Sequence, residues 1–232
     1  MTSGCRSDEF ISSRLSQRQP PLPAPERGVY VLGAGGHAKV VISTLRALGM
    51  EVAGLYDDDA AKKGAMCAAV PVLGSIGSLN SEMTRECVLA IGDNATRQQL
   101  AERMSWVHWL TIVHPKAYVH DSARLGPGTV IMAGVVVQPD AQIGAHCIIN
   151  TGATVDHGCV VGDFCHVAPG CNLGGTVTLA EGVFMGIGSV AIQSISVGAW
   201  TAVGAGAAVV TDLPDRVLAM GVPARVRRKL GS

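Results

Sequence analysis

The sequence predicts an α/β N-terminal Rossmann-like domain followed by a parallel β-helix. Three observations predict this fold: alternating strand and helix patterns around a glycine-rich turn, an unbroken six-residue repeat, and few aromatic residues. Aromatic side chains make up only 4% of the 232 residues, whereas glycine occurs 29 times. A core with so few rings must be built from aliphatic side chains, which suits a scaffold of stacked repeats.

Domain boundaries follow from these patterns. Residues 1–27 are predicted to be a disordered tail or linker, because they lack the apolar segment of a secretion signal and include a proline-rich stretch at 19–25. Residues 28–113 are assigned to the Rossmann-like domain and residues 114–232 to the β-helix.

Composition excludes several classes of protein. The net charge is zero and only 16% of residues are charged, so nothing indicates nucleic-acid binding. No apolar run reaches the roughly 18 residues that cross a bilayer. The seven cysteines include no C-x-x-C pair, so we expect reduced thiols, a cytoplasmic location and no metal site.

In the front domain, strand and helix patterns alternate. Residues 29–32 read as a buried strand, 33–38 as a turn and 39–48 as a helix. Further strands are expected over 51–56 and 88–91. Such alternation predicts a parallel sheet.

The turn after the first strand carries a nucleotide-binding pattern. Gly33, Gly35 and Ala38 match G-x-G-x-x-A, and Asp57 and Asp58 follow about 20 residues later. A helix that begins at such a turn offers free N–H groups to phosphate. About 85 residues hold one mononucleotide-binding half, which favours a sugar-linked nucleoside diphosphate over NAD. A tight turn without any ligand is the alternative.

The second half is defined by its repeat. From Ala117 to Asp212 the chain divides into sixteen blocks of six, and the third residue of each block is aliphatic or Met except at Ala191. Six residues fit a short strand plus a turn, and three such sides make a coil of 18 residues with strands about 4.8 Å apart. The repeat itself leaves the handedness of the coil open. Cys147 and Cys165, one coil apart, and Cys159 and Cys171 are expected to be small buried wall residues.

Four histidines lie within the repeat. His120 and His146 stand at block ends or turns, where we expect solvated surface residues. His157 and His166 stand in the middle of the repeat, and the residues alone leave open whether each belongs to the wall or to a site.

Several motifs occur in a fixed order: Gly-Ala-Gly-Gly-His, Tyr-Asp-Asp, Ile-Gly-Asp-Asn, Ile-Asn-Thr-Gly-Ala-Thr-Val-Asp-His, His-Val-Ala-Pro-Gly and Gly-Val-Pro-Ala-Arg. Together they resemble the bacterial nucleotide-amino-sugar N-acetyltransferases, over about residues 28–230. Sialic acid O-acetyltransferases are a close relative. The resemblance implies a left-handed coil, acetyl-CoA as cosubstrate, no metal, and direct acetyl transfer to a UDP- or GDP-linked 4-amino-4,6-dideoxy sugar.

The resemblance also implies roles for single residues. His157 would be the general base, and the backbone N–H of Gly175 would face the thioester oxygen. The acetyl-CoA site would be lined by Asn150, His166, Gly186, Ile187, Ala205 and Arg225. The nucleotide or its diphosphate would contact Gly35, Gly36, His37, Asp57, Asp58 and Asp93.

One residue departs from the family pattern. Several relatives place an acidic residue directly after the catalytic histidine, whereas this chain has Gly158. Asp156 precedes His157, and it could assist the imidazole only if a turn bends the chain there.

Counting residues around the coil predicts how the site is shared. Position modulo 18 places Asn150 and His166 together on adjacent coils, while His157 falls more than one side of the prism away. A homotrimer would bring His157 of one subunit against Asn150 and His166 of the next. Two other functions remain open at this point: an O-acetyltransferase acting on sialic acid or a related sugar, and a non-catalytic nucleotide-sugar-binding scaffold.

Overall fold

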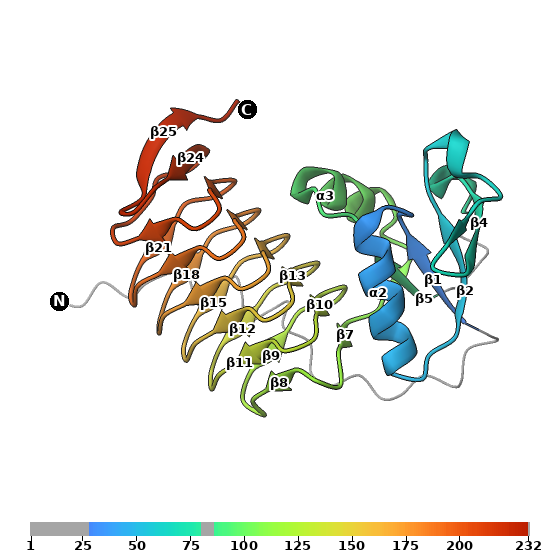
Figure 1. Ribbon diagram of the computed structural model, residues 1–232, viewed down its shortest axis with the longest axis horizontal. Helices are drawn as coiled ribbons and strands as arrows, with labels where there is room; N and C mark the ends of the chain where they lie inside the picture. Colours follow the sequence, from blue (N-terminus) through green and yellow to red (C-terminus); the bar gives the residue numbers. More distant parts are fainter. Residues whose placement is uncertain (1–27, 80–85, 232) are drawn as a thin grey trace.

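The computed structural model describes residues 28–79 and 86–231, which form two units packed side by side (Figure 1). The tail predicted for residues 1–27 lies outside the described residues. Across the described part of the chain, no helix is both long and apolar enough to cross a membrane.

The front unit is a six-stranded sheet in the order β3-β4-β2-β1-β5-β6. All neighbours pair in parallel except β3 and β4, which are antiparallel. β1 lies between β2 and β5, so the chain leaves β1 towards one edge and later returns to its other side. The predicted Rossmann-like half is confirmed. The strands are β1 (Val29–Leu32), β2 (Val52–Tyr56), β3 (Met66–Cys67), β4 (Val70–Gly74), β5 (Glu86–Leu89) and β6 (His108–Trp109).

Helix α2 (Gly36–Ala47) begins three residues earlier than the sequence pattern predicted. The glycine-rich stretch 33–38 reads as a turn throughout, but its second half forms the first helical turn. Ala38, Val41, Ile42 and Leu45 are buried, and this spacing of i, i+3, i+4 and i+7 fixes the helix on the sheet. Tertiary packing therefore overrides the low helix propensity of glycine.

Helix α3 (Asn94–Arg103) was not predicted from the sequence. Its buried positions include the polar Asn94 and Arg97 beside Leu100 and Ala101, so hydrophobic periodicity does not reveal it. The side chain of Asp93 caps the helix by accepting a hydrogen bond from the Thr96 N–H at 2.8 Å. Two short 3₁₀ helices, Ala60–Lys62 and Ile76–Ser78, complete the unit.

The second unit is a left-handed parallel β-helix with three faces, here called sheets I, II and III. Residues 18 apart pair from 112 to 209, as in the series Val130, Ile148, His166 and Phe184, whereas Ala202 pairs with Leu218, 16 residues further on. Sheet I contains β7 (Ile112–Val113), β10 (Val130–Ile131), β13 (Ile148–Ile149), β16 (His166–Val167), β19 (Phe184–Met185), β22 (Ala202–Val203), β24 (Val217–Met220) and β25 (Arg225–Lys229). Sheet II contains β8 (Tyr118–Val119), β11 (Val136–Val137), β14 (Thr154–Val155), β17 (Asn172–Leu173), β20 (Val190–Ala191) and β23 (Ala208–Val209). Sheet III contains β9 (Arg124–Leu125), β12 (Gln142–Ile143), β15 (Val160–Val161), β18 (Thr178–Leu179) and β21 (Ser196–Val197).

The inward column predicted from the third block position is confirmed. Ile131, Ile149 and Val167 have no exposed surface, and even the exceptional Ala191 is buried. The four wall cysteines of the repeat are fully buried as well, and none of the six described cysteines forms a disulfide.

The corners of the prism have their own rule. The sixth residue of successive blocks has a positive φ, whether it is a glycine such as Gly158 (φ 63) or a residue with a side chain such as Phe164 (φ 59). A left-handed residue costs roughly 1 kcal/mol or more when it is not glycine, so the backbone demand is partly independent of the side chain. His146 occupies one of these corners with φ 54.

The front unit packs on sheet I. β7, which the sequence division assigned to the front domain, pairs with β10 and forms the first strand of this sheet. α2 contacts β7, and the Thr44 hydroxyl lies 3.5 Å from the Met132 sulfur. In Figure 1, α2 and α3 lie on the side of the front unit that is nearer the coils, and they pack against opposite faces of the front sheet.

The inward aliphatic column should dominate the stability of the β-helix. Ile149→Ala should lower the free energy of unfolding by about 2–5 kcal/mol, because it leaves a cavity in the prism. Ile192→Ala is the matched control, since Ile192 is 42% exposed. Urea unfolding measures both variants, and equal losses would contradict this account of the core.

Candidate active site

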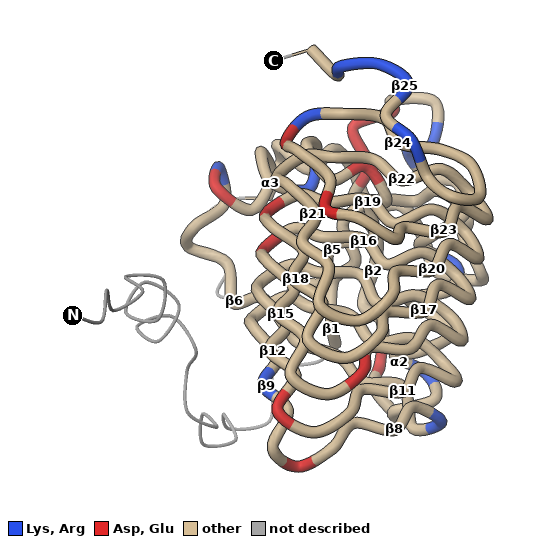
Figure 2. The backbone as a smooth tube through the Cα atoms, turned by 90° about the vertical axis from the view of Figure 1, so that its left-hand side faces the viewer, with Lys and Arg blue, Asp and Glu red and all other residues tan. Residues whose placement is uncertain are grey.

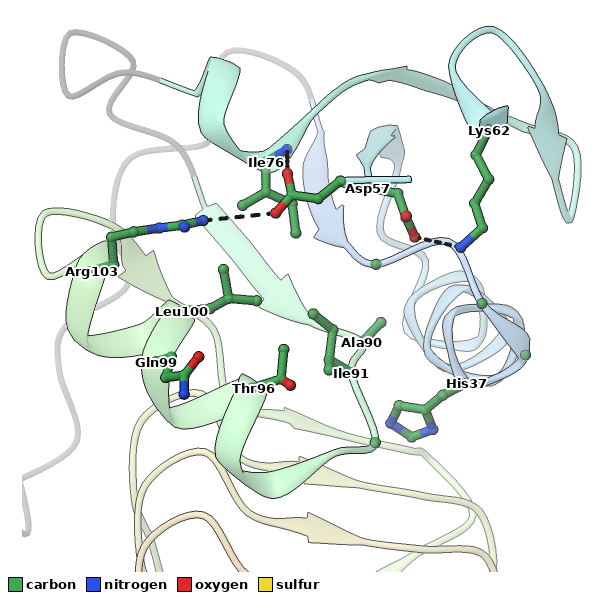
Figure 3. Close-up of a pocket in the computed structure, with 15 residues that line it drawn as sticks. His37, Asp57, Lys62, Ile76, Ala90, Ile91, Thr96, Gln99, Leu100 and Arg103 are labelled. Atoms are coloured by element: carbon green, nitrogen blue, oxygen red, sulfur yellow. Dashed lines mark hydrogen bonds and ion pairs between the residues drawn. The ribbon is translucent and has the colours of Figure 1, made fainter. Parts of the chain in front are cut away.

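A cavity of about 690 Å³ opens at the carboxyl ends of β1 and β5. The strand order reverses direction here, because β2 lies on one side of β1 and β5 on the other. Ligands bind at such points in open α/β folds. Of the residues predicted to contact a nucleotide, Gly35, Gly36, His37, Asp57 and Asp58 line the cavity (Figure 3).

The glycines of the turn have different physical roles. Gly33 has a φ of 108°, and a Cβ there would meet the Ala90 carbonyl oxygen at 2.8 Å, so β1 and β5 approach too closely for a side chain. Gly35 and Gly36 face open space, with no atom within 4 Å of a Cβ. Because α2 begins here without an acidic residue in its first turn, its free N–H groups can receive an anion.

Asp57 holds the turn in place. Its Oδ2 accepts hydrogen bonds from the Ala34 N–H at 2.7 Å and from the Lys62 ammonium at 3.0 Å, and its Oδ1 accepts from the Asp59 N–H. Burial pushes the pKa of Asp57 upward, but these donors outweigh burial and the pKa lies below its usual value. The carboxylate therefore stays ionised and shapes the cavity.

Asp58 keeps more capacity to bind a ligand. Its Oδ1 accepts from the Ile76 N–H at 2.8 Å, while its Oδ2 lies 3.9 Å from an Arg103 nitrogen, beyond hydrogen-bonding distance (Figure 3). Its side chain is about half exposed. Asp93 does not line the cavity, and its carboxylate is engaged by the N–H and hydroxyl of Thr96 as the cap of α3.

His166 and Asn150 meet, as the residue count predicted. The Asn150 Nδ2 lies 3.1 Å from the His166 Nε2, and the His166 Nδ1 lies 3.3 Å from the Gly92 carbonyl oxygen. A carbonyl only accepts, so Nδ1 carries the proton and Nε2 accepts from the asparagine amide. Burial, followed by the nearby Arg97 charge, lowers the pKa of His166 to about 4, which keeps the imidazole neutral.

His37 connects the cavity to this pair. Its ring centroid lies 6.3 Å from that of His166, and its Nε2 is buried with no hydrogen-bond partner among the described residues. Burial and the Arg97 charge lower the pKa of His37 to about 4. A neutral imidazole with a free nitrogen therefore stands between the cavity and sheet I.

His157 and Gly175 meet at a different corner, between sheets II and III. A Cβ on Gly175 would meet the His157 Nε2 at 2.5 Å, so the imidazole lies directly over the glycine one coil further on. His157 is otherwise exposed to solvent. A side chain at position 175 would displace the imidazole.

The backbone N–H of Gly175 is free of protein partners within the described ranges. At some other corners a side chain satisfies the corresponding N–H: Asn150 accepts from Thr151, and Asp156 accepts from His157 at 2.7 Å. Gly174 has no side chain to do so. An unpaired backbone donor is costly when buried, so this one is suited to a ligand oxygen.

The turn at His157 and Gly158 does bend the chain after Asp156. The Asp156 Oδ1 nevertheless accepts a hydrogen bond from the backbone N–H of His157, so the carboxylate stabilises the turn rather than hydrogen-bonding the imidazole. At position 158 the φ of 63° favours glycine, although neighbouring corners tolerate larger residues.

The remaining predicted acetyl-CoA residues follow one corner, between sheets I and II. Asn150 follows β13, Gly186 and Ile187 follow β19, and Ala205 follows β22. Ile187 is 61% exposed, and a Cβ on Gly186 would meet the Val203 carbonyl at 2.6 Å. Arg225 lies beyond them in the exposed strand β25, where basic residues gather at the end of the coils (Figure 2).

Two features escaped sequence analysis. His146 is buried rather than solvated: its ring stacks on Phe164 at 5.3 Å and meets the edge of Trp109, because the front unit covers this corner. Arg97 is 1% exposed and lies where the two units meet. Neither contact could be predicted from the sequence, because α3 is polar and has no hydrophobic periodicity. Among the described residues, no three His, Cys, Asp or Glu side chains gather as a metal site would require.

Comparisons with known proteins match both units. The PglD N-terminal domain family matches residues 28–104, and the bacterial transferase hexapeptide family (six repeats) matches residues 122–157. Among solved structures, the chain is similar to PerB of Caulobacter crescentus, solved with CoA and GDP-perosamine. The two share 44% identity over 88% of this chain and 98% of PerB, with a TM-score of 0.82.

Two further relatives agree. The acetyltransferase domain of PglB from Neisseria gonorrhoeae is 36% identical over 87% of this chain and all of that domain, with a TM-score of 0.81. The UDP-N-acetylbacillosamine N-acetyltransferase of Bacillus subtilis (strain 168) is 40% identical over 114 residues, which are 46% of this chain and 52% of the relative. The chain spans about half or less of the curated relatives that it matches.

Three buried neutral histidines should make stability depend on pH. His37, His146 and His166 have pKa values near 4 when folded, below the ordinary value of 6.5. As the pH falls from about 6.5 to about 4, the unfolded chain takes up protons that the folded chain excludes, so the free energy of unfolding should fall. Urea titrations across this range measure the slope.

The variant His146→Gln removes one of the three groups and should flatten that slope. His120→Gln is the control, because His120 is less buried and bonds the Ser122 hydroxyl. Identical slopes for His146→Gln and the unmodified protein would show that His146 is not held neutral.

Proposed function

This chain belongs to the sugar N-acetyltransferase family of hexapeptide-repeat proteins that includes PerB, and on that premise we propose that it transfers the acetyl group of acetyl-CoA to a nucleotide-linked amino sugar. The acceptor of this proposal is a UDP- or GDP-linked 4-amino-4,6-dideoxy sugar. The observation that supports it best is that two candidate sites touch in one chain. Gly92 lines a nucleotide-sized cavity in the front unit, and its carbonyl accepts from His166, which pairs with Asn150.

The front cavity suits the acceptor. The N-terminus of α2, with Gly35 and Gly36 leaving space above it, offers donors to a diphosphate. Asp58 has an oxygen available for a base N–H, whereas Asp57 shapes the turn. His37 stands at the inner end of the cavity, where the sugar would leave the front unit for sheet I.

The corner between sheets I and II suits acetyl-CoA. Asn150 and His166 stand at one end of the corner, Gly186, Ile187 and Ala205 follow along it, and Arg225 lies near its far end. This order fits a long cosubstrate with a thioester at one end and phosphates at the other. Arg225 is exposed and can pair with a phosphate.

His157 and Gly175 supply the proposed chemistry. The sugar amine attacks the thioester carbonyl carbon, a C–N bond forms, and the imidazole of His157 accepts the amine proton. The Gly175 N–H donates to the carbonyl oxygen as it becomes negative. The C–S bond then breaks, and the CoA thiolate leaves and is protonated. No acyl-enzyme forms, so both substrates bind together.

These two groups of residues stand at opposite edges of sheet II within one subunit. Asn150 follows β13 before sheet II, and His157 follows β14 after it. A homotrimer packed through these faces would place His157 of one subunit beside Asn150 and His166 of the next. Tyr118 and Val190 on the outer face of sheet II are 53% and 37% exposed, which fits a surface that is covered on assembly. A cytoplasmic location is part of the same proposal.

The first test is a thiol-release assay with acetyl-CoA. We expect CoA release with UDP- or GDP-linked 4-amino sugars and none with sialic acid, because only the amine is the proposed nucleophile. His157→Ala should lower kcat by about 10²- to 10⁴-fold with little change in acetyl-CoA affinity. Activity within threefold of the unmodified enzyme would remove His157 from the role of base.

The shared site predicts complementation. His157→Ala and His166→Ala proteins, each nearly inactive, should regain partial activity after they are unfolded and reassembled together. Hybrid trimers then contain sites with both histidines, contributed by different subunits. Sedimentation checks the trimer, and mass spectrometry checks that hybrids form. Hybrids without activity, or a monomer in solution, would contradict a site between subunits.

A further inference from the structure

Arg97 stands between the two units as a fully enclosed cation. It is 1% exposed, in the first half of α3, and no carboxylate forms an ion pair with it within the described ranges. Burial lowers the pKa of Arg97 to about 10, so the guanidinium remains charged at neutral pH. A buried charge without a counter-ion is tolerated only where many dipoles surround it.

All the acceptors around Arg97 are uncharged oxygens. Its Nε donates to the His146 carbonyl at 2.7 Å, and its Nη2 donates to the Phe164 carbonyl at 2.7 Å and approaches the Cys165 carbonyl at 3.3 Å. These three carbonyls belong to two successive coils of the β-helix. One edge of the guanidinium is therefore hydrogen-bonded to the wall of the second unit.

The other edge of the guanidinium binds the front unit. The Nη1 donates to the Ile91 carbonyl at 3.0 Å and approaches the Gly92 carbonyl at 3.4 Å, and the Nη2 also donates to the Asn94 Oδ1 at 2.9 Å. A guanidinium has five N–H donors in a fixed plane, and six acceptors surround this one. One rigid group thus binds the cavity loop and the coils at the same time.

The loop that Arg97 holds belongs to both parts of the proposed site. Ile91 and Gly92 line the nucleotide cavity, and the Gly92 carbonyl accepts from the His166 Nδ1. Asn94 reinforces the contact, because its Nδ2 donates to the Gly182 carbonyl at 3.0 Å and approaches the Val183 carbonyl at 3.2 Å. A shift of this loop would move the acceptor cavity relative to His166 and would release the imidazole.

We propose that Arg97 is a positioning residue, which sets the nucleotide cavity of the front unit in register with the acetyl-transfer site on the β-helix. This inference rests on the proposed function. Arg97 does not line the cavity. It acts by fixing the distance between two binding sites that lie on different units, so that the amine of a bound sugar reaches the thioester.

The geometry separates this role from simple charge. Lysine would keep the positive charge but has one nitrogen with three donors, which cannot reach all the carbonyls that the guanidinium binds along its different edges. Arg97→Lys should therefore lower kcat by about 10- to 100-fold, in line with the cost of misplacing reacting groups by about an ångström. The affinities for CoA alone and for GDP or UDP alone should stay within threefold, because each lies within one unit.

The experiment measures these three quantities on the full-length chain: kcat with acetyl-CoA and the acceptor, and the calorimetric affinities for CoA and for the free nucleoside diphosphate. Arg46→Lys is the matched control. Arg46 also donates to a backbone carbonyl, that of Ala68, but this contact lies within the front unit, so all three quantities should be unchanged.

Asn94→Ala is the second, milder variant, in case Arg97→Lys does not fold. It should show the same pattern with a loss of kcat of about 3- to 10-fold, since only one part of the contact is removed. A normal kcat in the folded variants would overturn the positioning role. A loss of both affinities in parallel with kcat would also overturn it, because that pattern indicates unfolding. An unmodified enzyme that acetylates no amino sugar would instead overturn the proposed function.

Discussion

Parallel pairing of residues 18 apart holds the coils over residues 112–209 together, and the rest of the molecule depends on that register. Each two-residue strand pairs in parallel with the strand one coil before and one coil after, as Ile148 does with Val130 and His166. A shift by one residue would turn the inward aliphatic column outward. The same register stacks His157 over Gly175 and places Asn150 beside His166. Core and candidate site therefore share one constraint.

A β-helix alone offers only corners and flat faces. The front unit changes this by covering the first coils of sheet I, where Ile112, Val130 and Ile148 are buried beneath it. It also encloses His166, which is 9% exposed, and supplies the carbonyl that fixes its tautomer. Further along the same sheet, Phe184 stays 36% exposed beside His166. The docked unit thus ends where the candidate acetyl site begins.

Polar groups rather than apolar ones make this contact specific. Arg97 and Asn94 bind carbonyls of the coils directly, where hydrophobic packing would permit sliding along a repetitive surface. Successive coils are nearly equivalent, so a purely apolar interface would let the front unit bind at several positions along the axis of the β-helix. Directional hydrogen bonds to particular turns select one of these positions, where the rings of His146 and Phe164 also stack.

The sequence by itself determined the repeat, the inward column, the glycine-rich turn and the meeting of Asn150 with His166. These follow from strict local periods, because a strand period of two and a coil of 18 residues leave no freedom in where a side chain points. The tertiary structure alone decided the burial of His146, the existence of α3 and the contacts of Arg97. A sequence pattern reports which residues avoid water, whereas these residues are polar and are enclosed only because a second unit covers them. Their partners are backbone carbonyls, which every residue possesses and which therefore leave no trace in the order of side chains.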